Sequence, residues 1–187
     1  MDVTGQFRPK KCVTNNKEYT MKKQGFTLIE LMVVIVIMGI LAAVAVPKLF
    51  GMIAKSKASE VGPAAGEYVK LQQAYISEAV KLGSWEMIGY KGPGANTKGG
   101  ATGGGTSTTT NFDYKDAKSF SNKTVAIGTT LAGFTATNKP VLNDCAAGGT
   151  WVMTMTGSAG DTDATFTASV TGGGCEELTP SFKNIGK

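Results

Sequence analysis

The chain of 187 residues contains no histidine. Without an imidazole, histidine-based acid–base catalysis, Ser-His-Asp and Cys-His nucleophiles and the usual zinc-hydrolase ligand sets are excluded. The carboxylates Asp144, Glu176 and Glu177 form no pattern with catalytic spacing. We therefore expect no enzymatic activity, no cofactor and no metal centre. A monomeric, membrane-anchored enzyme or binding module is the alternative of a different class.

Acidic residues are scarce in the first 25 residues, which carry six basic and two acidic side chains. That segment has a net charge of +4, whereas the whole chain has +5, so residues 26–187 are close to neutral. A basic footprint for nucleic acid would have to lie on the folded part of the chain. The distribution of charge indicates no specific nucleic-acid site.

Charge is almost absent from Phe26 to Val46, where Glu30 is the only ionisable side chain. A helix of 21 residues at about 1.5 Å each reaches about 31 Å, which matches the hydrocarbon core of a bilayer. The basic residues before the segment predict a cytoplasmic N-terminus and an exported remainder. A cleaved secretory signal ending near Ala42–Ala45 is the alternative, although its apolar run would be shorter.

Cysteine is also scarce, with three residues. Cys145 and Cys175 lie in the exported part, where a disulfide can form, while Cys12 lies on the cytoplasmic side of the anchor. The simplest arrangement pairs Cys145 with Cys175, and two separate buried thiols are the alternative. Closing this loop stabilises a domain by about 3 to 4 kcal/mol in the chain-entropy model.

Glu30 is the residue that a plain membrane anchor does not explain, because a carboxylate is unfavourable in hydrocarbon. Thr27 and Glu30 have the spacing of a capping box, in which each satisfies a backbone N–H at a helix start. Alternatively, the Glu30 side chain reaches the membrane interface. Neither explanation accounts for the whole run from Lys22 to Leu31.

That run, Lys-Lys-Gln-Gly-Phe-Thr-Leu-Ile-Glu-Leu, resembles the prepilin signature of type IV pilins and of the related type II secretion pseudopilins. The similarity extends through Pro47. It implies that a prepilin peptidase and methyltransferase cleaves after Gly25, so that residues 1–25 are a leader, and N-methylates Phe26. Met21 starts a complete short leader, so residues 1–20 come from an upstream start codon or belong to a long leader of the other pilin subtype.

The resemblance also implies the function: a structural subunit that polymerises through its apolar helix into a type IV pilus. Such filaments serve adhesion, twitching motility or DNA uptake; a type II secretion pseudopilin is the alternative. Implied partners are other copies of the chain, the inner membrane, the assembly platform and minor pilins. The precursor would lie in the bacterial inner membrane and the subunit in the extracellular filament. Glu30 would pair with the Phe26 amine of a neighbouring subunit, or with its own.

Helical spacing continues beyond the apolar segment and predicts one helix over 26–82. Pro47 and the Gly62-Pro63 pair weaken it, and we hypothesise a bend or local unwinding at Pro47 in the filament, with a mild kink as the alternative. The expected fold is α+β: this long helix, half membrane-spanning and half amphipathic, packs on a small antiparallel sheet within a head over 83–187.

Within that head, residues 91–111 are rich in glycine and threonine and predict a surface loop. Strands are predicted over 124–127, 133–137, 150–156 and 164–171, the last two by clear alternation and joined by a hairpin at 157–163. Trp151, Met153 and Met155 should share one face. Asp161 and Asp163 in the hairpin are oxygen ligands of the kind calcium uses, but a solvated turn is the simpler interpretation.

Overall fold

The structure, a computed structural model, describes residues 25–100 and 102–187. The expectations for the leader, Cys12 and Met21 lie outside the described residues. The chain forms two compact units, of which the first ends at Leu41 and the second runs from Ala42 to Lys187. In order, the elements are α1 (Leu28–Ala58), α2 (Val61–Ala79), β1 (Lys81–Gly83), β2 (Ala95–Thr97), β3 (Thr106–Thr108), β4 (Phe112–Lys115), β5 (Thr124–Ala126), β6 (Leu131–Asn138), β7 (Thr150–Thr156), β8 (Thr165–Thr171), and the 3-10 helices η1 (Glu176–Leu178) and η2 (Phe182–Asn184).

The predicted helix is present, but a turn at Ser59 and Glu60 divides it into α1 and α2. The break has a local cause: Pro63 has no N–H to donate to the Ser59 carbonyl, and proline is tolerated in the first turn of a new helix. Pro47 lies inside α1, which continues past it. The hypothesised bend at Pro47 concerns the filament and stays a prediction.

Helix α2 ends at Ala79, three residues earlier than predicted. Val80 adopts the left-handed conformation with φ 49°, and its N–H donates to the Ile76 carbonyl at 2.9 Å. This is the geometry of a helix C-terminal cap. The following residues then leave the helix axis and pair as β1 with β5 in a separate two-stranded sheet.

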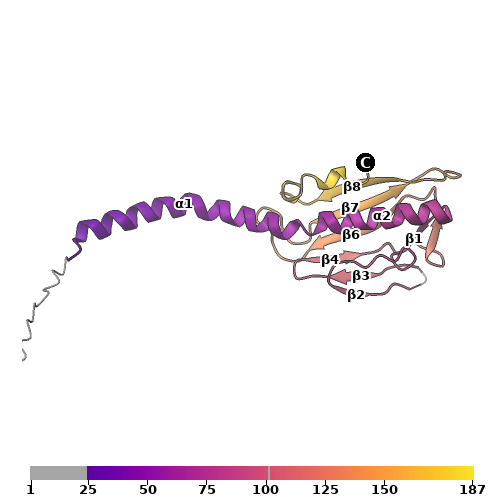
Figure 1. Cartoon of the computed structure of the whole chain (residues 1–187), viewed down its shortest axis with the longest axis horizontal. Helices are drawn as coiled ribbons and strands as arrows, with labels where there is room; N and C mark the ends of the chain where they lie inside the picture. The colour runs from indigo at the N-terminus through magenta and orange to yellow at the C-terminus, as the bar shows by residue number, and fades with distance from the viewer. Residues whose placement is uncertain (1–24, 101) are drawn as a thin grey trace, which may run out of the picture. The chain divides into compact units, whose positions relative to one another are not determined.

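The main sheet has six antiparallel strands in the order β2-β3-β4-β6-β7-β8 (Figure 1). The α+β prediction is confirmed. Strand β7 has the predicted bounds, β8 begins one residue later than predicted, and β6 is longer at both ends. Strand β5 forms close to its predicted place, although it lies outside the main sheet.

The prediction of a surface loop over 91–111 was incomplete, because β2 and β3 lie within it and form the edge of the main sheet. Glycines reverse the chain between the strands, as the φ of 83° at both Gly103 and Gly104 shows. The Thr106–Thr108 segment then pairs with β4. Its high β-propensity outweighs the surrounding glycines once a partner strand is available.

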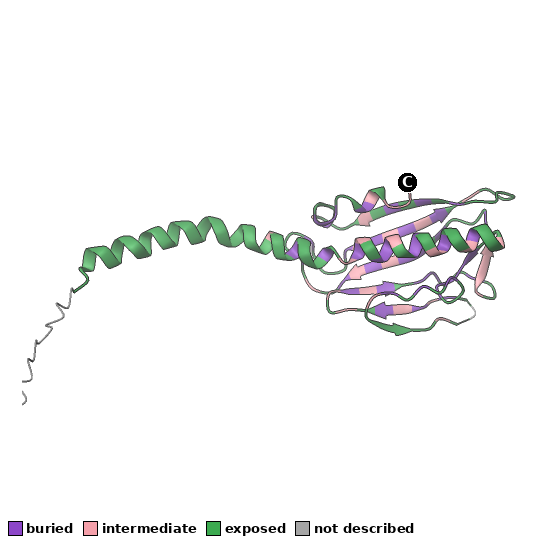
Figure 2. Ribbon diagram, viewed as in Figure 1, coloured by how far each residue is buried: buried purple, intermediate pink, exposed green. Residues whose placement is uncertain are grey.

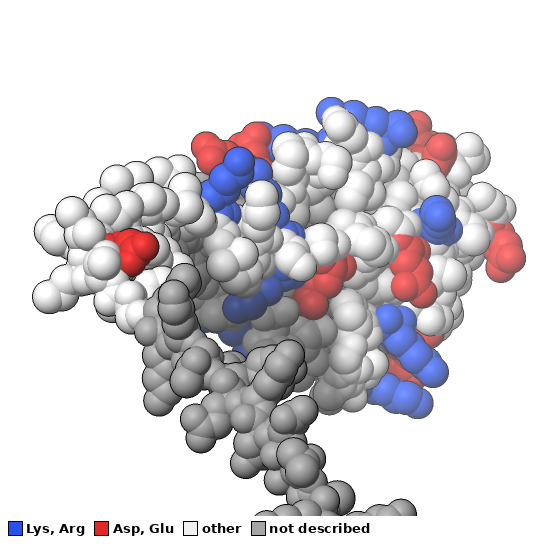
Figure 3. Space-filling model, turned by 60° about the vertical axis from the view of Figure 1, so that its left-hand side comes forward, with Lys and Arg blue, Asp and Glu red and all other residues white. Residues whose placement is uncertain are grey.

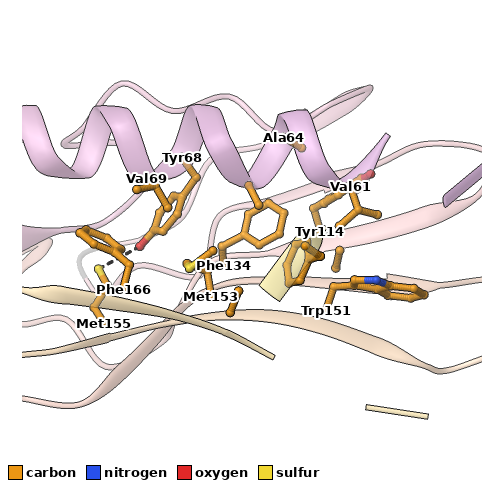
Figure 4. Close-up of a cluster of buried hydrophobic side chains, with 14 of the residues drawn as sticks. Val61, Ala64, Tyr68, Val69, Tyr114, Phe134, Trp151, Met153, Met155 and Phe166 are labelled. Carbon is orange, nitrogen blue, oxygen red and sulfur yellow. Dashed lines mark hydrogen bonds between the residues drawn. The ribbon is translucent and has the colours of Figure 1, made fainter. Parts of the chain in front are cut away.

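The core lies between one face of α2 and the main sheet (Figures 2 and 4). From the helix, Tyr68 and Val69 point toward the sheet. From β7, Trp151, Met153 and Met155 are fully buried on one face, as the alternation predicted. The helix and the sheet therefore bury each other's apolar faces, which makes the head a folded unit.

One close approach in this core requires a glycine. Gly133 interrupts the register of β6 against β7, between Ala132 and Phe134. A Cβ there would overlap the Tyr68 hydroxyl and lie 2.5 Å from the Met155 methyl. The Tyr68 hydroxyl is instead free to donate to the Met155 sulfur at 3.2 Å.

Candidate functional site

The predicted processing site lies outside the helix, at its N-terminal side. Gly25, Phe26 and Thr27 have no regular secondary structure, and α1 begins at Leu28. The Phe26 side chain is 81% exposed, and the space around Gly25 is open. Gly25 and Phe26 are thus exposed and lie outside regular secondary structure, and cleavage between them stays a prediction.

Glu30 forms a capping box with Thr27, the first of the two local explanations for its position. Its Oε2 accepts hydrogen bonds from the Thr27 backbone N–H and from the Thr27 hydroxyl, both at 2.8 Å. In return, the Glu30 N–H donates to the Thr27 hydroxyl oxygen at 3.3 Å. An ionised carboxylate has about four acceptor positions, so capping leaves capacity for a further cationic donor.

Helix α1 presents an apolar surface that the described part of its own chain does not cover. Glu30 is the only charged residue from Phe26 to Pro47. All residues from Leu28 to Phe50 are exposed (Figure 2). Within the described residues, the helical stretch Leu28–Ala79 contains a window long and apolar enough to cross a membrane. Exposed apolar area of this extent indicates a lipid or protein partner.

The head contains a disulfide between Cys145 and Cys175, the two cysteines that were expected to pair. Both are fully buried, and the bridge closes the chain around β7 and β8. Two neighbouring glycines make room for it, because a Cβ at Gly149 or Gly172 would lie 2.5 or 2.7 Å from the Cys175 sulfur.

Two carboxylates in the head, one half-buried and one buried, were not predicted from the sequence. The Glu60 Oε1, at the turn between α1 and α2, accepts hydrogen bonds from the hydroxyls of Thr109 at 2.6 Å and Tyr114 at 3.0 Å. Burial, with the charge of Glu60, raises the pKa of Tyr114 well above its usual range. These two hydrogen bonds hold the turn between α1 and α2 against β4 and against the residues just before β4. The bonded residues lie far apart in the sequence, so no local pattern predicts the contact.

The second is Asp116, directly after β4, which is 6% exposed. Its Oδ2 accepts a hydrogen bond from the Trp85 N–H at 3.0 Å, while its Oδ1 has no partner within the described residues. Burial raises its pKa to about 7, although backbone N–H groups of Trp85, Ala117 and Gly104 act in the opposite direction. The carboxyl holds the segment after β1 against the sheet.

Among the described residues, the other acidic side chains predicted as candidates do not come together in a site. Asp161 and Asp163 accept backbone hydrogen bonds from Ser158 and Ala164, both at 2.7 Å, within the turn. Glu176 pairs with Lys183 at 2.6 Å on the surface. Across the described ranges, no group of three or more His, Cys, Asp or Glu residues is placed to hold a metal ion.

Comparison with known proteins places the N-terminal motif in a defined class. Residues 20–46 match the family model described as the prokaryotic N-terminal methylation motif. The chain is 43% identical over 81 residues to the type IV major fimbrial protein FimA of Dichelobacter nodosus. The aligned residues make up 43% of this chain and 45% of that protein. It is 44% identical over 57 residues to the type IV major pilin protein PilA of Myxococcus xanthus (strain DK1622), covering 30% of this chain and 26% of that protein.

The chain thus matches less than half the length of these curated relatives. No solved structure matches it significantly. The methylation motif, the apolar helix and the antiparallel sheet define an α+β protein with an apolar N-terminal helix. In its N-terminal part, the chain is similar to type IV major pilins and fimbrial proteins.

Proposed function

We propose that the chain is a structural subunit of a type IV pilus, which polymerises through α1 into surface filaments for adhesion, twitching motility or DNA uptake. One observation carries the proposal: the methylation motif at residues 20–46 includes the exposed apolar first part of α1, in which Glu30 is the single acidic residue. The relatives reported above are named as major pilins or fimbrial proteins, which favours a pilin over a secretion pseudopilin. The function proposed is structural rather than enzymatic.

The apolar surface supports both stages of such a life cycle. In the inner membrane, with the N-terminus in the cytoplasm, α1 would be covered by lipid; in the filament it would be covered by the α1 helices of other copies. Leaving the membrane is unfavourable for an apolar helix unless other apolar surface replaces the lipid. Polymerisation, guided by the assembly platform and minor pilins, provides that replacement.

Maturation would change the charge at the tip of the helix. Cleavage after Gly25 removes the +4 leader and creates an amine on Phe26, which is then N-methylated. The amine lies four residues before Glu30, whose carboxylate already folds back toward the helix start through Thr27. An intermolecular pair between this amine and the Glu30 carboxylate of a neighbouring copy would favour one axial register, because every other stagger leaves both charges unpaired.

Capping and subunit pairing by Glu30 are separated by a matched pair of variants. Thr27→Ala removes the side-chain partner of the capping box but keeps the carboxylate, whereas Glu30→Ala removes both functions. We expect Thr27→Ala to assemble nearly as the unmodified chain does. Glu30→Ala should yield about tenfold fewer filaments in sheared supernatants, the change that loss of one interhelical polar contact supports. Equal losses in the two variants would mean that Glu30 serves only as a cap.

Mixed filaments separate pairing between subunits from pairing within one subunit. If the pair is intermolecular, a Glu30→Ala subunit still offers its amine to a neighbour's carboxylate and should enter filaments together with unmodified subunits. If Glu30 pairs with its own amine, the variant should be excluded from mixed filaments as well. The filaments themselves are tested by electron microscopy and mass spectrometry, and a mature N-terminus other than methylated Phe26 would contradict the proposal.

A further inference from the structure

A second exposed surface lies where α1 reaches the head, entirely within the unit that starts at Ala42. Apolar side chains there are open to solvent, with Phe50 58% and Val141 64% exposed. Three exposed lysines lie among them on α1. We call this set the junction surface; it consists of Lys48, Leu49, Phe50, Met52, Ile53, Lys55, Lys57 and Val141.

A groove runs through the junction surface between α1 and the turn that precedes the disulfide. It has a volume of about 250 Å³ and is lined by Phe50, Ile53, Ala54, Lys57, Val141, Leu142 and Asn143. The helix residues recur at steps of three and four, so they share the face of α1 that meets the turn. The groove is thus lined mostly by apolar side chains, together with Lys57 and Asn143.

The turn cannot fold inward to hide Val141. Leu142, the next residue, is 1% exposed, and its N–H and carbonyl pair with the carbonyl and N–H of Cys145 at 2.9 and 3.0 Å. Cys145 is fixed in turn by the disulfide to Cys175. An apolar side chain held outward by such an anchored turn indicates a partner that covers it.

The position of the junction surface along α1 points to the partner. The predicted membrane span ends at Val46, and α1 continues to Ala58. At about 1.5 Å per residue, Phe50 lies about 6 Å beyond the end of the span, and Lys57 about 16 Å beyond it. The headgroup layer on each side of a bilayer is about 5 to 8 Å thick. The junction surface therefore begins in the headgroup layer and extends just past it.

The charge of the junction surface also points to an anionic partner. Within the described ranges, none of the three junction lysines forms an ion pair. The nearby Glu60 is already bonded to Thr109 and Tyr114. A second copy would bring the same three lysines and repel them, whereas anionic headgroups attract lysines and accept aromatic and aliphatic side chains beside them.

We propose that the junction surface binds anionic phospholipid at the membrane face from which α1 emerges, and so holds the head of the unassembled subunit against the bilayer. The inference rests on the membrane-anchored precursor of the proposed function. Docking keeps apolar groups such as Phe50 and Val141 out of water before assembly. Assembly must then release this contact, so membrane charge opposes extraction of the subunit.

The test uses the full chain in vesicles, with Val141→Cys in a Cys12→Ser background carrying a polarity-sensitive fluorophore. In vesicles that contain phosphatidylglycerol, we expect blue-shifted emission that headgroup spin-labelled lipid quenches. In pure phosphatidylcholine, emission should be close to that of a probe in water. A probe at Thr162→Cys, in the exposed hairpin turn, should be water-like in both.

Replacing the junction lysines with glutamine tests the recognition itself. Near an anionic surface, each lysine changes binding about fivefold, so the triple variant should lower the ratio of docked to undocked heads about a hundredfold. A control with Lys70, Lys81 and Lys98 changed to glutamine loses the same charge from exposed positions elsewhere and should dock normally.

Three results would overturn the inference, and they can be told apart. If the chain is lost from vesicles in an alkaline wash, the membrane anchor itself fails, and the docking inference fails with it. If the chain stays anchored but the Val141 probe remains in water, only the docking inference fails. If emission follows the protein-to-lipid ratio rather than phosphatidylglycerol content, the surface binds a second copy instead.

Discussion

The buried carboxyl of Asp116 makes a sharp prediction about how stability depends on pH. The folded chain raises the pKa of this group from its ordinary value of 3.8 to about 7, chiefly through burial. Between those two pH values, the folded state holds a proton that the unfolded state has released. Raising the pH through this window therefore destabilises the fold, and the full effect corresponds to about 4 kcal/mol.

Asp116→Asn removes the titration while leaving a side-chain oxygen that can accept the Trp85 N–H. We expect the free energy of unfolding of the unmodified chain to fall with pH by up to about 1.4 kcal/mol per pH unit. In the variant, this fall should disappear. At about pH 4, where the folded chain holds Asp116 protonated, the variant should be less stable than the unmodified chain by about 1 to 3 kcal/mol, because the new amide group replaces Oδ1, which has no hydrogen-bond partner within the described residues.

The assay is denaturant unfolding of the full chain in detergent, followed across about pH 4 to 8. Asp113→Asn provides a control, because that carboxylate is half-exposed and lies 3.9 Å from the Lys139 amine in a surface ion pair. It should leave the pH slope of the unmodified chain in place. If Asp116→Asn kept that slope, or if the unmodified chain gained stability from pH 5 to 7, the reasoning would be refuted.

Two further predictions concern the packing of the head. Replacing Cys145 and Cys175 together with serine opens a loop of 30 residues and should cost about 3.6 kcal/mol in the chain-entropy model, measured as a lower denaturant midpoint. An unchanged denaturant midpoint in the double variant would contradict this. So would a reductant that lowers the midpoint of the double variant as much as that of the unmodified chain, because the double variant has no Cys145–Cys175 disulfide to reduce. Gly133→Ala forces a methyl group into the Tyr68 hydroxyl and should cost about 1 to 3 kcal/mol or more. Gly173→Ala, in open space, should cost far less, and similar losses at both positions would show that Gly133 relaxes.

Local sequence patterns were sufficient to predict an element wherever the residues that determine it lie close together in the chain. The apolar run before Lys48 predicted a helix, and Thr27 with Glu30 predicted its capping box. Strict alternation predicted β7 to the residue, including its buried face. In each case, the element is predicted by the period of hydrophobicity or by a spacing within one helical turn, so no residue far away in the sequence has to be known.

Other features depended on partners far away in the sequence. The Thr106–Thr108 strand becomes regular only because β4 pairs with it, and glycine-rich flanks concealed it. The hydrogen bonds of Glu60 could not be predicted from the sequence either, because they join residues that are 49 and 54 positions apart. For Asp116, burial in the folded chain raises the pKa, and the hydrogen bond that its carboxylate accepts from the Trp85 N–H spans 31 residues.

The sequence by itself therefore determined a basic N-terminal segment, the methylation motif and an apolar helix with one carboxylate. Tertiary structure decided how the head is held together and what the base of α1 exposes. Val141 illustrates the difference, since only the disulfide-anchored turn places it beside Phe50. Periodicity records which face of an element is apolar, but only the packed chain shows which apolar face stays uncovered.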